Sequence, residues 1–363
     1  MVHKKRILHI TSSLKMGGAE QVLFQLLRSL RDDFEHTVIY FNEGPFVEKI
    51  KSLGISVYQV KGFFCRYDPL FWWRLYRLIK ALNPDVIHTL LWVANFAGRL
   101  LGHLLKKPVV CAIHSPCNTN AGFSSQRLFL DRLTMKWASR VICVSKQIPL
   151  APLAIQPAQV TYIENGVDSD WLYERSKKRI IQKASNHIII GTVGRLVSIK
   201  NQEVLLYLIK ELKPIYSNIQ LMIIGDGPLR LSLLDKAQEL HIADMVTIIA
   251  DEATFYYPLF DLFILSSFAE GLSIALLEAM SFGIIPLVAS SKKHDVIIHN
   301  SNGFLFNANN INELVQMVKN ILNEEVDIEN MKNRAVQTVR TRFSIFQMAQ
   351  SYKHVYEELS NDY

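Results

Sequence analysis

The 363-residue chain is longer than a single hydrophobic core usually supports, and at about 150 residues per domain its length predicts two domains. With 49% hydrophobic and 20% charged residues, the composition excludes a disordered or fibrous protein. The charge is uneven: residues 1–170 contain 21 Lys and Arg against 12 Asp and Glu, whereas the remainder contains 19 against 21. We therefore expect the first half to face an anionic partner, either nucleic acid or an acidic membrane surface.

The sequence favours a cytoplasmic protein. Its first 13 residues contain a basic cluster but too short an apolar run for a signal peptide. The most apolar long window, 86–105, carries two histidines, an asparagine and an arginine, which disqualifies it as an ordinary membrane span. The four cysteines, Cys65, Cys111, Cys117 and Cys143, form no CxxC pair, so reduced thiols are expected.

The first half alternates strand-like runs with amphipathic segments. Strands are predicted at 6–12, 36–41, 55–60, 85–90, 108–114 and 140–145. Between the first two, residues 21–33 have apolar positions at helical spacing. This alternation predicts a parallel sheet with helices on both faces.

The same pattern restarts after a polar stretch around residues 170–187. Strands are predicted near 188–193, 219–224, 245–250, 262–267 and 284–290, and helices at 202–213 and 229–240. We therefore predict two doubly wound α/β domains, 1–169 and 170–344, with a cleft where the carboxyl ends of both sheets face each other. The last segment, 345–363, is predicted to be a helix that could belong to either domain.

Gly17 and Gly18 lie in the turn GGAE, between the first predicted strand and the first helix. Glycines there let the backbone approach a ligand, and the following helix offers N–H groups and the positive end of its dipole. A tight strand-to-helix turn needs glycine as well, so both interpretations stay open. The turn lacks the G-x-G-x-x-G fingerprint, so it does not indicate NAD binding.

Gly194, Arg195 and Lys200 follow the first strand of the second half. Two cations at the end of a strand suit a diphosphate, although solvated loop charges would explain either residue alone. Gly225 belongs to GDGP, a strand-to-helix turn whose glycines either approach a base or simply form the corner.

Two glutamates flank a predicted helix start in the stretch SSFAEGLSIALLEAMSFG. Ser273 can cap a helix from Ile274 to Phe282, with Glu270 before it and Glu278 one to two turns inside it. At about 1.5 Å per residue, the two acids lie roughly 12 Å apart or more. That is about the reach of a nucleotide sugar from hexose to ribose. The alternative is a helix with one exposed acid and a loop acid that caps something.

Together these motifs resemble the retaining GT-B glycosyltransferases of family 4 across essentially the whole chain. The matching pieces are GGAE at 17–20, PDVIH at 84–88, His114 after the fifth strand, NGVD at 165–168, GR…K at 194–200, GDGP at 225–228 and E-x7-E at 270–278. Their order and spacing carry the resemblance. It implies a Rossmann-like acceptor domain followed by a Rossmann-like donor domain, with the terminal helix at 345–363 crossing back onto the first domain.

The resemblance implies a role for each matched residue. Arg195 and Lys200 would neutralise the donor diphosphate, Glu270 would bind hydroxyls of the donor sugar, and Glu278 would bind the ribose diol. His114 would reach the sugar near the reacting carbon, with a histidine that ends a core strand as the alternative. His9 and His88 are expected to be structural. The donor-binding set is completed by Gly17, Gly18, Gly194, Gly225, Gly271, Leu272 and Ser273.

The chemistry implied by the resemblance is departure of a nucleoside diphosphate from an oxocarbenium-like sugar, which the acceptor attacks on the same face. Cations and a helix dipole would stabilise the leaving group, and the sequence has no Asp-x-Asp motif, so no cofactor or divalent metal is expected. A UDP-hexose is the expected donor. Ser290–Asp295 and Ser266–Ser267 depart from the usual family pattern, which leaves the donor's identity open.

Aromatic and basic residues interleave at 63–80. A basic, aromatic-rich helix can lie on an anionic bilayer, which suits a lipid-linked acceptor; the equal alternative is a helix that packs its aromatics into the core. Nucleic acid is not expected, because no recognised binding motif accompanies the charge. The expected protein is therefore a cytoplasmic enzyme of bacterial surface-polysaccharide or lipopolysaccharide assembly, peripheral on the inner face of the membrane. A sugar-nucleotide epimerase and a non-catalytic partner subunit would share the fold.

Overall fold

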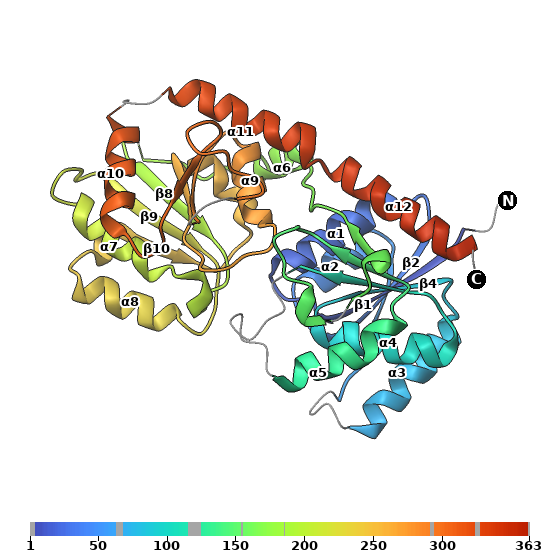
Figure 1. The fold of residues 1–363 in the computed structure, drawn as a ribbon. Coiled ribbons are helices and arrows are strands. Elements are labelled where there is room, and N and C mark those ends of the chain that lie inside the picture. The colour runs from blue at the N-terminus through green and yellow to red at the C-terminus, as the bar shows by residue number, and fades with distance from the viewer. Residues whose placement is uncertain are drawn as a thin grey trace. The chain divides into compact units, whose positions relative to one another are not determined.

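The structure, a computed structural model, describes residues 4–62, 68–114, 125–153, 155–184, 186–290, 294–323 and 327–361. The chain forms two compact units (Figure 1): unit 1 comprises Met1–Asn165 and Ile345–Tyr363, and unit 2 comprises Gly166–Ser344. Each unit is a doubly wound parallel sheet, so the predicted fold class is confirmed. The sequence placed the first boundary at 169/170, a few residues beyond the observed one.

Unit 1 contains a seven-stranded sheet in the order β3-β2-β1-β4-β5-β6-β7, and every strand pairing in it is parallel. Its strands are β1 (Arg6–Ser13), β2 (Glu35–Asn42), β3 (Ser56–Gln59), β4 (Val86–Leu90), β5 (Val109–Ile113), β6 (Arg140–Cys143) and β7 (Val160–Tyr162). Its α-helices are α1 (Gly18–Leu30), α2 (Phe46–Lys51), α3 (Pro69–Leu82), α4 (Trp92–Leu105), α5 (Ser125–Thr134) and α12 (Ile345–Asn361). The strand order reverses between β1 and β4, which is where ligands bind in open α/β sheets.

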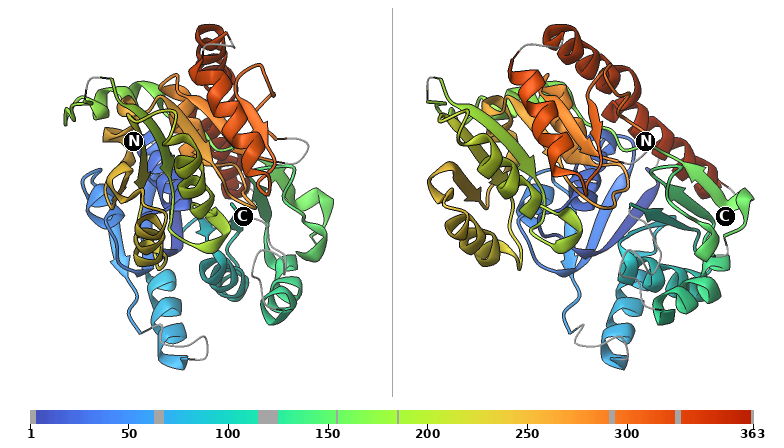
Figure 2. Two further views of the ribbon diagram at one scale, coloured as in Figure 1. Left: turned by 90° about the vertical axis from the view of Figure 1, so that its left-hand side faces the viewer. Right: turned by 60° about the vertical axis from the view of Figure 1, so that its left-hand side comes forward.

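The terminal helix α12 belongs to unit 1 although it follows unit 2 in the sequence. It lies along α1 and β4 and buries a row of side chains at helical spacing, including Met348, Tyr352, Val355, Tyr356 and Leu359. Figure 2 shows this helix, coloured red, running beside the first strands of the chain. Unit 1 is therefore completed by residues from both ends of the sequence.

Unit 2 contains a six-stranded parallel sheet in the order β10-β9-β8-β11-β12-β13. Its strands are β8 (Ile188–Val193), β9 (Ile219–Ile224), β10 (Val246–Ile249), β11 (Leu262–Leu265), β12 (Ile285–Ala289) and β13 (Phe304–Phe306). Its α-helices are α6 (Ser169–Ser176), α7 (Glu203–Leu212), α8 (Arg230–Glu239), α9 (Ile274–Ser281), α10 (Ile311–Leu322) and α11 (Ile328–Arg342).

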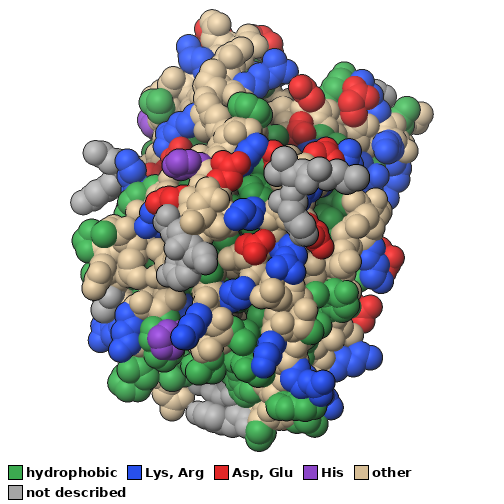
Figure 3. Space-filling view, turned by 90° about the vertical axis from the view of Figure 1, so that its right-hand side faces the viewer, with side chains coloured by type: hydrophobic (Ala, Val, Ile, Leu, Met, Phe, Trp, Pro, Cys, Tyr) green, Lys and Arg blue, Asp and Glu red, His purple; other side chains and the backbone are tan. Residues whose placement is uncertain are grey.

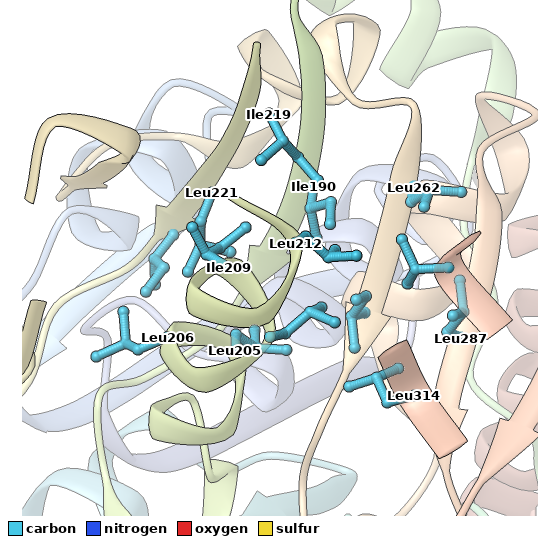
Figure 4. Packing of buried hydrophobic residues seen from close by; sticks show 14 of the residues in the cluster. Ile190, Leu205, Leu206, Ile209, Leu212, Ile219, Leu221, Leu262, Leu287 and Leu314 are labelled. Atoms are coloured by element: carbon cyan, nitrogen blue, oxygen red, sulfur yellow. The ribbon is translucent and has the colours of Figure 1, made fainter. Parts of the chain in front are cut away.

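The core of unit 2 lies between this sheet and its helices. Leu205, Ile209 and Leu212 of α7 face Ile190 of β8 and Leu221 of β9, and all five are fully buried (Figure 4). Because both faces of a parallel sheet are covered by helices, its strands read as nearly continuous apolar runs. This packing fixes the carboxyl ends of β8, β9 and β11, and those ends carry the candidate site.

Short 3-10 turns connect several elements. They are η2 (Met135–Trp137), η3 (Ala151–Leu153) and η4 (Pro157–Gln159) in unit 1, and η5 (Ser198–Lys200), η6 (Ala243–Met245), η7 (Ala253–Phe255) and η8 (Tyr257–Leu259) in unit 2. Among the residues that the structure describes, no helix combines the length and apolarity needed to cross a bilayer.

Candidate functional site

The loop after β8 and the loop after β9 pack backbone against backbone. The N–H of Gly194 donates to Ile224 O at 3.0 Å, and that of Leu196 donates to Asp226 O at 3.0 Å. A Cβ on Gly225 would lie 2.0 Å from Gly194 O, so only glycine fits there. Of the two interpretations of the GDGP turn, the packing of the corner already explains Gly225, and a contact with a base remains a proposal.

Lys200 and Glu270 form an ion pair across two loops that are far apart in the sequence. Lys200 ends η5, and its Nζ contacts Oε1 of Glu270; both side chains are partly exposed. Ser267 Oγ donates to the same carboxylate oxygen at 2.7 Å. Ser266 Oγ donates to Lys200 O at 2.9 Å, which fastens the two loops together. The Ser266–Ser267 pair, read from the sequence only as a family departure, therefore supports the ion pair.

Arg195 is the other cation of this loop, and it is exposed. In the described ranges its guanidinium makes no ion pair, whereas its backbone carbonyl accepts a hydrogen bond of 2.9 Å from Gln202 Nε2. Gln202 is buried and holds the loop in place. The loop after β8 thus presents one cation, Lys200, that is paired with a carboxylate and another, Arg195, that is exposed to solvent.

The helix α9 starts between the two glutamates, as predicted. Ser273 is its N-cap, and its Oγ accepts from the N–H of Leu276 at 3.4 Å. The capped first turn directs its N–H groups and its positive dipole end toward the Gly271–Ser273 segment. The predicted helix end at Phe282 is observed one residue earlier, at Ser281.

Glu278 is buried inside α9. Its Oε2 accepts a hydrogen bond of 2.8 Å from the hydroxyl of Tyr257, which is itself fully buried and stacks on Phe282. Burial and the charge of Glu278 raise the pKa of Tyr257 well above its usual range, so the phenol stays protonated and donates. Sequence reasoning missed Tyr257, because nothing in the run YYP indicates a partner twenty-one residues away.

His294 lies close to Glu270 in space. Its Nδ1 accepts two backbone N–H groups, from Val296 and Ile297, both at 3.2 Å. Burial lowers the pKa of His294, while the negative charges of Asp295 and Glu270 act in the opposite direction. The basic loop that departs from the family pattern therefore brings an imidazole near the acid assigned to sugar binding. Residues 291–293 of that loop lie outside the described residues.

Unit 1 contributes the glycine turn before α1. Gly17 is the N-cap of this helix with extended backbone, and a Cβ there would lie 2.4 Å from Oε2 of Glu20. Gly18 is the first residue of the helix. The close contact of Gly17 is thus with its own helix, which gives the turn a local reason for glycine and leaves its role toward a ligand as a proposal.

His114 follows directly after β5. Both of its ring nitrogens are buried and have no hydrogen-bond partner among the described residues. Desolvation lowers the pKa of His114 to about 4, so the imidazole is neutral at physiological pH. Unit 1 therefore provides a neutral histidine at the carboxyl edge of its sheet. Cys117 and the rest of 115–124, which follow it, lie outside the described residues, as does Cys65.

Two doubly wound units, one with a basic strand-end loop and a capped helix start, place the chain in the class of proteins built from two Rossmann-like domains. The sequence model of the family described as glycosyl transferases group 1 matches residues 174–340, and that of glycosyltransferase family 4 matches residues 16–171. The chain belongs to the family 4 glycosyltransferases of GT-B fold and is a glycosyltransferase.

Two relatives that match over nearly their whole length come from bacteria. The chain is 24% identical to the UDP-Gal:alpha-D-GlcNAc-diphosphoundecaprenol alpha-1,3-galactosyltransferase of Escherichia coli, over 98% of this chain and 97% of that protein. It is also 24% identical to an alpha-1,4-N-acetyl-D-galactosaminyltransferase of Campylobacter jejuni that acts on an undecaprenol-linked glycan, over 97% and 96% of the two chains.

A solved structure supports the fold. Anabaena HepE in complex with UDP and glucose superimposes with a TM-score of 0.84 at 20% sequence identity, covering 98% of this chain and all of that one. At this identity the likeness establishes the GT-B architecture alone.

Proposed function

We propose that the protein is a retaining, metal-independent hexosyltransferase that uses a UDP-sugar and a lipid-linked glycan acceptor in bacterial surface-polysaccharide or lipopolysaccharide assembly. The observation that carries the proposal is the arrangement of Lys200, Glu270 and Ser267 beside the capped start of α9. A helix N-terminus with two cations nearby can bind an anion without a metal. The relatives named for UDP-galactose and diphosphoundecaprenol support the choice of donor and acceptor.

In this proposal, binding of the donor breaks the Lys200–Glu270 ion pair, and each of the two side chains then binds a part of the donor. Without donor, Lys200 is neutralised by Glu270. A diphosphate takes over Lys200 and is clasped by the open guanidinium of Arg195, because both cations gain a stronger acceptor. The carboxylate of Glu270, still held by Ser267, then accepts hydrogen bonds from hydroxyls of the sugar. Glu278, oriented by Tyr257, binds the ribose diol.

Departure of UDP leaves positive charge on the sugar and new negative charge on the β-phosphate. Arg195, Lys200 and the dipole of α9 stabilise that negative charge, which is the main demand of the reaction. Neutral His114 accepts a hydrogen bond from the sugar near the reacting carbon. The acceptor hydroxyl then attacks on the face from which UDP leaves and gives its proton to an oxygen of the departing β-phosphate, which gives retention of configuration.

The test is transfer of a labelled sugar. The purified protein is incubated with UDP-, GDP- and ADP-sugars and with undecaprenol-linked glycans extracted from bacterial membranes, in the presence and absence of EDTA. We expect a labelled lipid-linked product from a UDP-hexose, with undiminished yield in EDTA and an α-linkage by NMR. Failure to bind UDP in calorimetry would contradict the proposal.

An acceptor anchored in lipid needs an enzyme that reaches the bilayer, and unit 1 has a surface suited to it. We call this surface, formed by the exposed faces of α3 and α5, the helical patch. It exposes Trp73 to 53%, Phe129 to 65% and Leu133 to 52%, and Leu70 lies beside Trp73. Its basic residues are Arg74, Arg77, Lys80 and Arg132, and Lys136 of η2 directly follows α5; all five are exposed.

The two helices of the helical patch are joined through α4. Trp72 of α3 packs edge-on against Phe96, which stacks on Trp92, and Trp92 Nε1 donates to Asp131 of α5 at 2.8 Å. Asp131 is buried, so neither helix exposes an acidic side chain. In Figure 2, α3 lies at the lower end of unit 1, and the lower part of Figure 3 shows hydrophobic and basic side chains with few acidic ones.

The described part of the basic aromatic segment therefore agrees in part with each interpretation: one face of its helix packs into the core, and the other is exposed. Phe71, Leu75 and Ile79 pack into the core, whereas Leu70 and Trp73 point outward beside the basic residues. Residues 63–67 lie outside the described residues. Exposed aromatic and apolar side chains among Lys and Arg favour adsorption to an anionic interface. We propose that the protein binds there as a cytoplasmic, peripheral enzyme.

Flotation on vesicles tests the helical patch. The wild-type chain should float with phosphatidylglycerol vesicles at low salt and not with phosphatidylcholine vesicles. The double variant Phe129→Ser, Leu133→Ser should lose flotation, while Leu231→Ser, which alters a side chain 72% exposed on unit 2, should float like the wild type. Equal flotation of both variants would contradict the surface assignment without affecting the donor chemistry.

A further inference from the structure

Three histidines and a tyrosine form a buried hydrogen-bonded chain inside unit 1. His36 Nε2 lies 3.1 Å from Leu30 O, and His36 Nδ1 lies 2.9 Å from His9 Nε2. His9 Nδ1 then lies 3.1 Å from His88 Nδ1, which is also 2.9 Å from the hydroxyl of Tyr356 on α12. Strands β2, β1 and β4 and the terminal helix are thus linked by rings alone.

The carbonyl at one end fixes the direction of every bond in this chain. A carbonyl only accepts, so His36 carries its proton on Nε2, and its Nδ1 must accept from His9 Nε2. Each ring is buried and therefore neutral, with one proton. His9 Nδ1 is then an acceptor as well, and His88 must carry its proton on Nδ1, shared with Tyr356 as a second acceptor.

The chain of hydrogen bonds therefore ends at Nε2 of His88, whose lone pair accepts no hydrogen bond from the described residues. Nε2 of His88 is buried and has no hydrogen-bond partner among the described residues. The hydroxyl of Tyr352 on α12 is in the same condition, and its ring lies 5.3 Å from that of His88, centroid to centroid. Buried polar atoms without a protein partner commonly bind an internal water molecule.

His114 lies on the same face of the sheet as these atoms. His88 pairs in register with Val110, and side chains alternate along a strand, so Val110, Ala112 and the residue after β5, His114, share the face of His88. Both ring nitrogens of His114 are buried and unpartnered in the described part of the chain. A positive charge on His114 also lowers the pKa of His88, as does a positive charge on His36.

We infer that His88 and Tyr352 are positioning residues for His114, acting through water held between Nε2 of His88, the hydroxyl of Tyr352 and the imidazole of His114. This inference rests on the proposed role of His114 at the donor sugar. Because Nε2 of His88 can only accept, the water donates to it, and the water's oxygen is free to accept an N–H from His114. The nitrogen of His114 on the other side of the ring is then left bare, as an acceptor for the sugar.

In this inference the terminal helix α12 contributes to the reaction through two tyrosines. Its Tyr356 touches the proton-bearing nitrogen of His88, and its Tyr352 supplies one wall of the water site. The hydrogen-bond direction imposed by a single backbone carbonyl, Leu30 O, passes through three rings and ends at Nε2 of His88. No covalent step is involved, since the chain only selects one tautomer and one orientation.

Nitrogen NMR of the histidine rings tests the first part without any assay of activity. With 15N-labelled histidine at neutral pH, and with assignment by single His→Asn variants, His9 and His36 should carry the proton on Nε2 and His88 on Nδ1. The Nδ1 form is the less common tautomer of a neutral histidine, so chance agreement is small. A proton on Nε2 of His88, or a protonated His88, would overturn the inference whether or not the protein transfers sugar.

Kinetics of Tyr352→Phe test the second part. This variant keeps the ring and removes the hydroxyl, and we expect kcat to fall about tenfold with the donor KM little changed, because orientation and not binding is disturbed. The matched control, Tyr58→Phe, alters an exposed tyrosine of β3 and should behave like the wild type. An unchanged kcat in folded Tyr352→Phe would overturn the inference. A wild-type protein that turns over no UDP-sugar would instead contradict the proposed function and leave the NMR result standing.

Discussion

Lys200 carries the chemical proposal at the scale of single residues. Its ammonium group is neutralised by Glu270 before a donor binds, so the affinity of the site for other anions is expected to be reduced. The two residues are seventy positions apart in the sequence, and they are held together by Ser266 and Ser267, adjacent residues on the loop that carries Glu270. A cation held in this way is available to a stronger acceptor at little structural cost.

Lys200→Ala should reduce turnover more than binding. Removing a cation that stabilises the leaving diphosphate is expected to lower kcat by about 100-fold, with the donor KM changed only a few-fold. Steady-state kinetics of sugar transfer measure both constants. Lys210→Ala, an exposed lysine on α7, serves as the control and should leave both unchanged. A large rise in KM with normal kcat would show that Lys200 only binds.

Tyr257→Phe should weaken the support of Glu278. The variant keeps the stacking on Phe282 but removes the 2.8 Å hydrogen bond to a buried carboxylate. Leaving a buried acceptor less satisfied should lower the free energy of unfolding by about 1–3 kcal/mol. The affinity for UDP should fall as well, because the carboxylate loses its orientation. Urea unfolding and calorimetry measure the two effects, and Tyr173→Phe, at an exposed tyrosine, should change neither.

At the scale of elements, a buried ion pair fixes α5 to α4. Arg99 NH2 contacts Asp131, Arg99 Nε donates to Thr134 Oγ1 at 3.1 Å, and Trp92 completes the cluster. Both charged side chains are almost fully buried. Because α5 supplies half of the helical patch, this pair holds the proposed membrane surface together.

Asp131→Ala should therefore be strongly destabilising. It leaves the guanidinium of Arg99 buried without a counter-charge, which costs about 3–5 kcal/mol. Chemical denaturation gives the value. Glu48→Ala breaks the exposed Lys51–Glu48 pair instead and should cost less than about 1 kcal/mol. A similar small loss for Asp131→Ala would mean that Arg99 finds water or another partner.

Local signals explain which elements the sequence predicted. The strands β8 and β11 are nearly continuous apolar runs, and β1 and β4 contain apolar runs interrupted by a histidine. The start of α9 follows from Ser273, a residue type that caps helices. The three-residue strands β7 and β13 escaped prediction, because they are too short to show a period.

The same limit applies to the site. The positions of Arg195, Lys200, Glu270 and Glu278 follow from motifs, but their partners depend on tertiary contacts. Neither the Lys200–Glu270 pair nor the hydrogen bond from Tyr257 has a sequence signal. His9 and His88 were expected to be structural, whereas no pattern indicated that they would join His36 in one chain.

At the scale of the whole molecule, the buried histidines make stability sensitive to acid. Desolvation lowers the pKa of His36 to about 4 and that of His88 to about 3, and the pKa of His9 is lowered too. In the unfolded chain these groups titrate near 6.5. Below that pH the unfolded chain binds protons that the folded chain does not, so the stability present above pH 6.5 is lost as pH falls toward 4 and 3.

Unfolding measured between pH 6.5 and 5 should show this loss, before most carboxylates titrate. At about 1.4 kcal/mol per pH unit for each histidine, the wild type should lose several kcal/mol across the window. His36→Gln keeps a donor for Leu30 O but does not titrate, so its stability should fall less steeply. His354→Gln, an exposed histidine on α12, should keep the wild-type slope. If the stability of all three proteins depended equally on pH, the buried His36 would bind protons in the folded chain as readily as in the unfolded chain, and the prediction would be wrong.

The two ends of unit 2 meet, since Val167 bridges Ser344 and its N–H donates to Phe343 O at 2.9 Å. The segment Gly166–Ser344 is therefore an inserted domain whose first and last residues lie side by side, within a unit 1 that is formed by the residues before and after it. Exchanging that segment between family members would replace unit 2 through a single pair of junctions. Such chimaeras must keep α12 of the protein that supplies unit 1. A chain that ends after Ser344 would lack Tyr352 and Tyr356, which contact His88.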